Sequence, residues 1–359
     1  MKTKSRIDME KNICGIQQIG IGVADAGEAW KWYRGAFGMD INVFEDTATA
    51  KLMLPYTNGQ ECRRYAALAM NMEGGGGFEI WQHTDMLSKP PVFNVQLGDC
   101  GIYICKMKSR NIRQAFEGHQ AKGLDLIGTL CPDPQGRLHY YLRDPYNNIF
   151  EITEDSSFYL KQKSLTGGVA GAVIGVSDID EAKKVYADIL QYSQVVFDES
   201  GRFDDFAALP GGNETYRRVL LKHQPRTGPF SKLLGPTRIE LVQPLDRRPK
   251  KIYQDRIWGE LGFIHICFDI MGMDFLKQEC EQKGFPFTVN SADSFDMGSA
   301  AGHFSYISDP DGTPIEFVET HKLPIIEKLG WYMKLKGRDP KKSLPNWMIN
   351  TLKFSRVKD

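Results

Sequence analysis

Four glutamates, each set between two apolar residues, recur along this chain in segments of similar plan. In an alternating strand, an acid in such a position points to the face of the sheet opposite its neighbours. One glutamate of this kind is ordinary, whereas four indicate a repeated module that brings a carboxylate to one place. The four segments are Phe78-Glu79-Ile80, Phe150-Glu151-Ile152, Ile239-Glu240-Leu241 and Ile315-Glu316-Phe317.

The second and fourth segments share the spacing of a turn that leads into a strand. Glu151 lies seven residues after Asp144, and Glu316 lies seven residues after Asp309. A proline follows each of these aspartates, which predicts a turn before the strand. The second and fourth modules are therefore copies of one unit.

The first and third modules share a helix start of a different type. Asp25 and Asp178 are placed to cap helices, and each is followed three residues later by a glutamate. A tyrosine follows each aspartate after eight residues, at Tyr33 and Tyr186. The chain therefore repeats as A-B-A′-B′, and each module runs strand, helix, then several strands. The modules are 12–85, 95–154, 167–245 and 258–320.

This plan resembles the vicinal oxygen chelate superfamily, which includes glyoxalase I, bleomycin resistance proteins and extradiol dioxygenases. The resemblance rests on the D-x-x-E-A helix starts, the Asp-Pro turns and the closing glutamates, and it covers residues 12–320. It implies an α+β fold of four βαβββ modules that form two cup-shaped mixed sheets. It also implies two glyoxalase-like domains, at 12–154 and 167–320, followed by a C-terminal extension at 321–359.

In the superfamily, the metal ligands come from the first and last strands of paired modules. If neighbouring modules pair here, the second site lacks one ligand, because Gly171 has no side chain. If module one pairs with four and two with three, one complete and one incomplete set result. The complete outer set is Gln18, Glu79, His265 and Glu316. The incomplete inner set is Tyr103, Glu151, Gly171 and Glu240. The outer set resembles that of glyoxalase I, so we expect one working metal site and one decayed site.

Two carboxylates, an amide oxygen and an imidazole suit one divalent ion, either Zn, Mn, Fe, Co or Ni. Such an ion would bind two adjacent oxygens of a substrate and acidify the neighbouring C–H group. Glu316 and Glu79 are the candidate bases that remove and return the proton through an enediolate. In the inner set we expect Tyr103 to fill the cup, and Glu151 and Glu240 to be hydrogen-bonded or neutral core acids.

The resemblance implies a metal-dependent isomerase or epimerase acting on a small hydroxy-ketone, a cyclitol ketone or an acyl thioester. Gly22 and Leu261 stand where glyoxalase I has arginines that hold glutathione, so glutathione-dependent activity is not expected. Gly171 stands where a ring-cleaving dioxygenase needs its first histidine. The alternatives are a lyase or dioxygenase of the same superfamily, or a ligand-sequestering protein like the bleomycin resistance proteins.

The resemblance implies a small-molecule substrate as partner, and the composition gives no signal for nucleic acid or for integral membrane association. Lys and Arg together equal Asp and Glu at 45 each, so no net charge favours nucleic acid. No apolar run is long enough to span a bilayer, and the polar N-terminus with reduced core cysteines predicts a cytoplasmic protein. The extension holds ten basic residues from 320 onward and several aromatics. We expect these aromatics to pack on the body or on a second copy in a homodimer, rather than on an anionic membrane surface.

Overall fold

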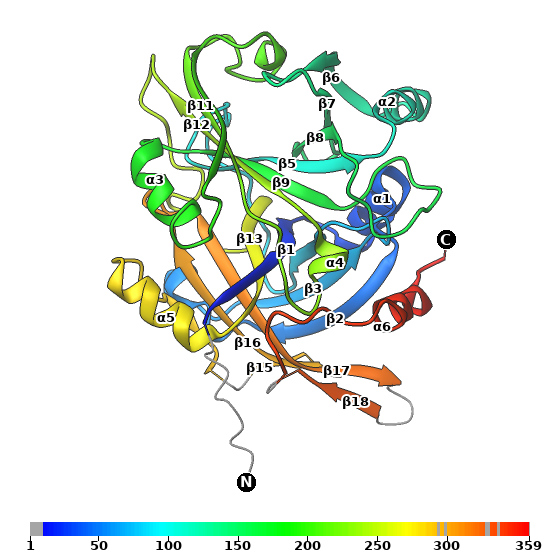
Figure 1. Cartoon of the computed structure of the whole chain (residues 1–359). Helices are drawn as coiled ribbons and strands as arrows, with labels where there is room; N and C mark the ends of the chain where they lie inside the picture. The colour runs from blue at the N-terminus through cyan, green and yellow to red at the C-terminus, as the bar shows by residue number, and fades with distance from the viewer. Residues whose placement is uncertain (1–9, 293–294, 298–299, 327–330, 336–337, 359) are drawn as a thin grey trace.

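Two curled mixed sheets form the body of the protein, as Figure 1 shows for the computed structural model. The structure describes residues 10–292, 295–297, 300–326, 331–335 and 338–358. Each of the four predicted modules is present as a strand, a helix and further strands. The predicted α+β architecture with two cups is confirmed.

The larger sheet, called here the outer cup, takes its strands from modules one and four. Its order is β14-β16-β17-β13-β1-β4-β3-β2, with β15 beside β16 and β18 beside β17. The first strands of the two modules, β1 and β13, pair antiparallel at its centre. Each of them pairs parallel with the closing strand of its own module, β4 or β17. The strands are β1 Asn12–Gly22, β2 Ile41–Thr49, β3 Arg63–Met70, β4 Gly77–His83, β13 Gly262–Met271, β14 Val289–Asn290, β15 Phe295–Met297, β16 Ala300–Ser308, β17 Pro314–Ile326 and β18 Trp331–Lys334.

The second sheet, called the inner cup, takes its strands from modules two and three. Its order is β10-β11-β12-β9-β5-β8-β7-β6, with β5 and β9 antiparallel at its centre. Each cup therefore combines one module from residues 12–154 with one from residues 167–320, as the outer pairing predicts. The strands are β5 Gly101–Ser109, β6 Asp125–Pro132, β7 Leu138–Arg143, β8 Ile149–Glu154, β9 Val169–Gly175, β10 Gln194–Gly201, β11 Tyr216–Lys222 and β12 Arg238–Pro244.

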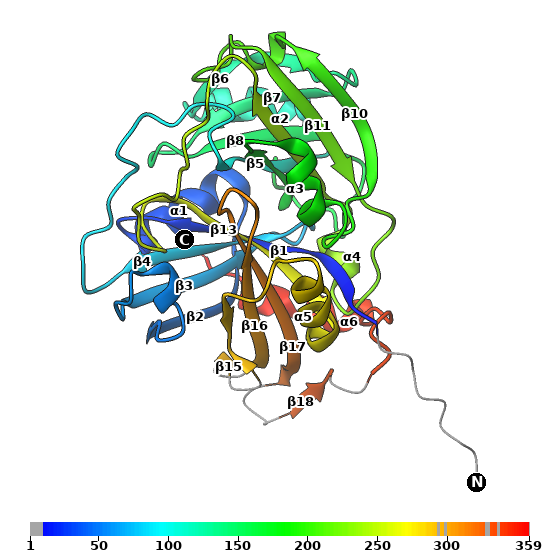
Figure 2. The ribbon, with the colours of Figure 1, turned by 90° about the vertical axis from the view of Figure 1, so that its left-hand side faces the viewer.

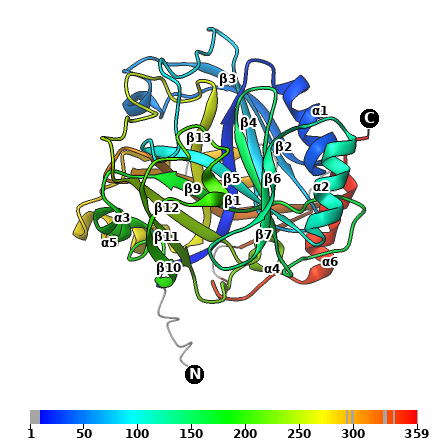
Figure 3. The same ribbon diagram turned by 90° about the horizontal axis from the view of Figure 1, so that it is seen from above.

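The helices lie on two sides of the molecule, with α3 and α5 on one side and α1, α2 and α6 on the other (Figure 3). The predicted N-caps are confirmed, because Asp25 accepts a hydrogen bond from the amide of Glu28 at 2.9 Å and Asp178 from that of Glu181 at 3.1 Å. The helices are α1 Ala26–Phe37, α2 Ile112–Ala121, α3 Ile179–Tyr186, α4 Ser231–Leu234, α5 Met273–Gln282 and α6 Asn346–Ile349, with 3₁₀ turns at Leu54–Tyr56, Asp204–Phe206 and Asn350–Ser355.

Modules one and two belong to different sheets, as do modules three and four, yet a buried tyrosine–aspartate hydrogen bond joins each of these pairs. Tyr33 on α1 donates to Asp144 in the Asp-Pro turn of module two, at 2.7 Å. Tyr186 on α3 donates to Asp309 in the matching turn of module four, at 2.9 Å. The recurring tyrosine and Asp-Pro positions in the sequence therefore form the same contact between the two cups twice.

The C-terminal extension packs on the body through aliphatic side chains. Leu335, Leu344 and Ile349 form an apolar cluster with Ile41 and Met70 of the outer cup. The chain end then pairs with β2, as the amide of Val357 donates to the carbonyl of Asp40 at 2.8 Å. Figure 2 shows α6 below the strands of the inner cup.

Two aromatic residues of the extension are exposed in this chain. Trp347 is 58% exposed and Phe354 is 90% exposed, so neither packs on the body. The side chains of Trp331 and Tyr332 lie outside the described part of the structure. A homodimer through this extension stays a prediction. Across the described residues, no helix combines the length and apolar character needed to cross a membrane.

Candidate metal centre

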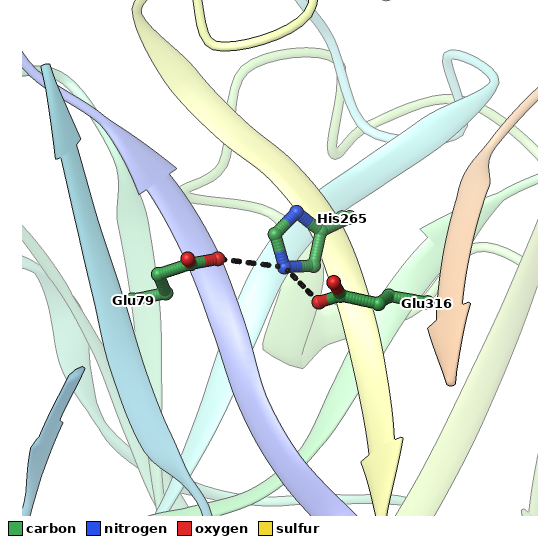
Figure 4. Close-up of side chains that lie close together, drawn as sticks. All are labelled: Glu79, His265 and Glu316. Carbon is green, nitrogen blue, oxygen red and sulfur yellow. Dashed lines mark ion pairs between the residues drawn. The ribbon is translucent and has the colours of Figure 1, made fainter. Parts of the chain in front are cut away.

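Three of the four predicted ligands converge at the centre of the outer cup, as Figure 4 shows. The Nε2 atom of His265 lies 3.2 Å from Oε2 of Glu79 and 3.0 Å from Oε2 of Glu316. One ligand atom from each residue lies within 4.8 Å of the other two. The three residues come from β4, β13 and β17, so residues about 240 positions apart in the sequence meet only after both modules have folded.

The strand register explains why these side chains meet. Laterally paired residues share one face of a sheet, and so do residues two positions apart on one strand. Two lateral rows cross the centre of the outer cup on the same face. The first row is Glu79, Gly20 and His265, and the second is Gln18, Cys267 and Glu316.

A glycine in the first row leaves room for the imidazole, a feature that the sequence analysis missed. A Cβ atom placed on Gly20 would lie 2.5 Å from Cε1 and 2.7 Å from Nδ1 of His265. Any side chain there would displace the ring. The available sequence signal was the position of Gly20 two residues after Gln18 on the same strand face.

Gln18 lies beside this cluster, and only one of its two amide atoms has a hydrogen-bond partner. Its Nε2 atom lies 3.4 Å from Oε2 of Glu316, and its Oε1 atom is buried without a hydrogen-bond partner. Rotation of the amide by 180° exchanges the two atoms and brings the oxygen, the metal-ligating atom, toward the cluster. The unpartnered oxygen therefore fits the role of a fourth ligand.

His265 is fully buried and held between acids and aromatic rings. Burial opposes its charge, but the carboxylates of Glu316 and Glu79 outweigh this effect and raise the pKa of His265 to about 9. The indole of Trp258 stacks on the imidazole with ring centroids 5.9 Å apart and an interplanar angle of 9°. Tyr306 meets the same ring edge-on at 5.7 Å. These rings keep bulk water away from one side of the cluster.

Comparison with known proteins identifies the family of this chain. Two family models, both described as the glyoxalase/bleomycin resistance protein/dioxygenase superfamily, match residues 15–152 and 172–303. The chain belongs to this superfamily. Among curated proteins, none matches the sequence.

Solved structures of the superfamily share the fold of this chain. Glyoxalase I from Zea mays is 13% identical, and the match covers 86% of this chain and 92% of that chain with a TM-score of 0.53. A putative dioxygenase from Bacillus subtilis subsp. subtilis str. 168 is 14% identical, with 97% of each chain covered and a TM-score of 0.55. Similarity at this level establishes the fold alone, so function has to be argued from the site.

The inner cup keeps the two closing glutamates of the superfamily plan but lacks its other ligand positions. Gly171 pairs with Arg238, two residues before the closing glutamate Glu240. Gln18 likewise pairs with Gly77, two residues before Glu79. The backbone of Gly171 has φ +152°, and an added Cβ would lie 1.8 Å from the carbonyl oxygen of Arg238. No side chain fits at Gly171, so the prediction that it supplies no ligand is supported by the backbone itself.

The assignment of Tyr103 as the counterpart of His265 needs correction. In module four the closing glutamate pairs with Cys267, two residues after His265. In module two it pairs with Lys106, so the matching position is Ile104 rather than Tyr103. A bulge near residue 103 shifts the register by one. Tyr103 is buried in the apolar cluster of the inner cup, as expected.

A closed ring of buried charges occupies the centre of the inner cup. Lys106 contacts both closing glutamates, reaching Glu240 at 2.7 Å and forming a shorter contact with Glu151. On the far side Arg218 contacts Glu240 and lies 2.7 Å from Asp205. The ring is completed by His139, which lies 3.1 Å from Glu151 and 3.5 Å from Asp205. Every member is less than a tenth exposed.

The ionisation of the ring members keeps it neutral overall. Burial opposes each charge, but Asp205, Cys131 and Glu151 together raise the pKa of His139 to about 11. Burial likewise opposes ionisation of Glu151, yet Lys106 and His139 hold its pKa well below its usual value. Three cations therefore balance three carboxylates. The inner glutamates are partnered core acids, as expected. Their partners are Lys106, Arg218 and His139, which the sequence did not indicate.

Proposed function

We propose that this chain is a divalent-metal-dependent isomerase or epimerase acting on a small hydroxy-ketone, a cyclitol ketone or an acyl thioester. The observation that carries the proposal is the convergence of Glu79, His265 and Glu316, with Gln18 beside them, at the centre of the outer cup. The donor set is two carboxylates, one imidazole and one amide oxygen.

The residues present fit a metal ion on three structural grounds. The amide oxygen of Gln18 and Nδ1 of His265 are buried without hydrogen-bond partners, and Nε2 of His265 faces the carboxylates of Glu79 and Glu316. Buried polar atoms of this kind normally have a partner, so a ligand is the simplest explanation for them. Gly20 keeps the space beside the imidazole free. This mixed N/O set suits Zn, Mn, Fe, Co or Ni.

The chemistry divides between the bound ion and the carboxylates. A divalent ion held here supplies a Lewis acid that polarises a substrate carbonyl and acidifies the neighbouring C–H group. Glu316 or Glu79 then takes the proton from that carbon and returns it to the neighbouring carbon or to the opposite face of the same carbon. The rings of Trp258 and Tyr306 cover His265 and limit access of water.

The ligand set favours this reaction over two alternatives. Ring-cleaving dioxygenases use two histidines and one carboxylate around iron, whereas the outer cup brings together one histidine and two carboxylates. A sequestering protein has no need of a ligand set and should hold no metal. A lyase that begins with the same proton removal remains a variant of the proposal, and its products would reveal it.

The test is solvent exchange at the substrate carbon. Metal-reconstituted protein is incubated in D₂O with hydroxy-ketones, cyclitol ketones and acyl thioesters, and loss of the α-C–H signal is followed by NMR. Wild-type protein should exchange at least one class, while Glu316→Gln should retain metal and lose most of the exchange. If Glu316→Gln exchanges normally and Glu79→Gln does not, Glu79 is the base. A metal-loaded protein that exchanges none of these compounds contradicts the proposal.

A further inference from the structure

The helix α6 and the 3₁₀ turn that follows it have one buried face and one exposed face. Ile349 and Leu352 belong to the apolar cluster that joins the extension to the outer cup. Trp347 and Phe354 are 58% and 90% exposed, and about two helical turns separate them, so they project from the same side of the segment. Figure 1 shows α6 at the edge of the molecule. Large aromatic side chains exposed on one face are typical of a contact surface.

Hydrogen bonds to the body hold this segment in place. The hydroxyl of Tyr159 donates to the carbonyl of Asn346 at 3.1 Å, and Nζ of Lys232 donates to the side-chain oxygen of Asn346 at 3.2 Å. At the other end, the amide of Val357 donates to the carbonyl of Asp40 at 2.8 Å. The aromatic residues are therefore presented on a preformed surface, which does not have to fold when it meets a partner.

The same part of the chain carries a local surplus of positive charge. Residues 338–358 hold six basic residues and one acid, although the chain as a whole has no net charge. Lys341, Lys342, Lys353 and Lys358 are exposed. Lys353 directly precedes Phe354, so positive charge and apolar surface lie together on this face.

A groove of about 440 Å³ lies beside the end of the extension. Its walls include four basic side chains and one acidic side chain, namely Arg34, Lys122, Lys163, Arg356 and Asp40. Arg356 pairs with Asp40, and Lys122 donates to the carbonyl of Gly35 at 2.6 Å. A guanidinium has five donors and an ammonium has three, so both groups retain donors for an anion. The groove therefore suits a phosphate group, and it lies two residues from Phe354.

An anionic lipid surface fits this combination better than two other occupants do. A second copy of the chain in a two-fold dimer would place the same basic face against itself, and the like charges would repel. A soluble anion would fill the groove but would leave both aromatic side chains exposed. A phospholipid bilayer offers phosphates to the cations and an interfacial layer in which Trp and Phe are favourable.

We infer that the C-terminal extension is a peripheral docking surface for an anionic phospholipid membrane. Trp347 and Phe354 enter the headgroup layer, and the exposed lysines of the extension contact lipid phosphates. One lipid phosphate lies in the groove beside Arg356. This inference does not depend on the metal centre or on the proposed reaction, because none of these residues belongs to the outer-cup site.

The experiment is co-sedimentation of the full chain with vesicles of phosphatidylcholine alone or with about one third phosphatidylserine. Binding to the phosphatidylserine vesicles should be at least about tenfold stronger and should weaken as salt is added. Trp347→Ala combined with Phe354→Ala should lower this binding at least about tenfold. Lys353→Glu combined with Lys358→Glu should lower it about tenfold or more and remove the preference for phosphatidylserine.

Two matched controls lie away from the extension. Leu87 is 90% exposed, as Phe354 is, and Leu87→Ala should leave vesicle binding unchanged. Lys51 is exposed and follows β2 at the end away from Ile41, which pairs with Arg356, so Lys51→Glu should also bind as the wild type does. All variants should keep the thermal unfolding midpoint and the metal content of the wild type, because the exchanged side chains are exposed.

Four outcomes would overturn the inference. They are absence of binding to phosphatidylserine vesicles, equal binding to both kinds of vesicle at all salt concentrations, and undiminished binding of the double aromatic variant. The fourth is a wild-type dimer in light scattering that becomes a monomer in that variant, since the extension would then be a subunit interface. Calorimetric binding of inorganic phosphate without vesicle binding would assign the groove to a soluble anion and overturn it as well. The solvent-exchange test of the proposed function uses no vesicles, so the two proposals can fail separately.

Discussion

The outer and inner cups have the same order of eight strands and the same pair of closing glutamates, yet only one has the features of a metal site. The difference lies in the residue that sits laterally beside each glutamate. In the outer cup these neighbours are Gly20 and Cys267. In the inner cup they are Lys106 and Val173.

This comparison shows two solutions to the same electrostatic problem. Two buried carboxylates close together are unfavourable unless a positive charge lies between them. In the outer cup that place belongs to an imidazole and, in our proposal, to a divalent ion. In the inner cup the ammonium of Lys106 bridges Glu151 and Glu240, so the charge is permanent and supplied by the protein. A site with its own cation has no need of a metal.

The largest expected effect distinguishes the two cups by metal content. His265→Ala should abolish metal retention after dialysis, because it removes the ligand at the centre of the cluster. Glu151→Ala, the matched change in the inner cup, should leave about one metal per chain. Elemental analysis of both proteins beside the wild type checks this. Two metals per wild-type chain, or loss of metal in Glu151→Ala alone, would reverse the assignment of the cups.

The second prediction concerns stability, for which the larger loss is expected in the inner cup. Lys106→Met should lower the free energy of unfolding by about 3–5 kcal/mol, because it leaves two buried carboxylates without the cation between them. Gln18→Met in the outer cup should cost about 1 kcal/mol or less, since its one hydrogen bond is long at 3.4 Å. Urea denaturation of chelator-treated proteins measures both, because a bound metal would add stability of its own. Equal costs would mean that the charge ring is not a structural replacement for a metal.

The sequence predicted the architecture well because the architecture depends on repeated, local signals. The helix caps at Asp25 and Asp178 and the Asp-Pro turns can be recognised within a few residues. The choice of outer pairing also followed from the sequence, since it collects the complete Gln18, Glu79, His265 and Glu316 set that resembles glyoxalase I. The closing glutamates were predicted because the same short pattern, a glutamate between two apolar residues, recurs in all four modules.

The charge ring could not be predicted because its members share no local pattern. Lys106 lies in an apolar strand and Arg218 in another, while Asp205 lies in a short 3₁₀ turn. Only the folded sheets bring them together. The error at Tyr103 has a related cause, because a β-bulge changes which side chain meets the closing glutamate without changing the apparent sequence match. Trp258 was also missed, since it lies at the very start of module four, before the first strand and outside any of its repeated motifs.

A third prediction uses pH to probe the inner cup. His139 faces Glu151, Asp205 and Cys131, and its pKa of about 11 in the folded state exceeds the ordinary 6.5. Its contribution to stability is therefore full below pH 6.5 and is lost as the pH rises toward 11, at up to about 1.4 kcal/mol per pH unit. His139→Gln should flatten this decline in urea denaturation between pH 7 and 9. His119→Gln is the control, because burial lowers the pKa of His119 to about 4 and it should not change the slope. An unchanged slope in His139→Gln would show that the ring does not hold a protonated histidine.

The smallest expected effect tests whether the two halves of the chain are equivalent outside the cups. Tyr33→Phe and Tyr186→Phe each remove one buried hydrogen bond to an aspartate, at Asp144 and Asp309. Each should cost about 1 kcal/mol in the free energy of unfolding, with metal content unchanged. Equal costs would mean that the sequence diverged at the cup centres while the contacts between consecutive modules stayed alike. A clearly larger cost for Tyr186→Phe would instead place the difference between the halves at their helices as well, and the charge ring would then be one of several asymmetries rather than the main one.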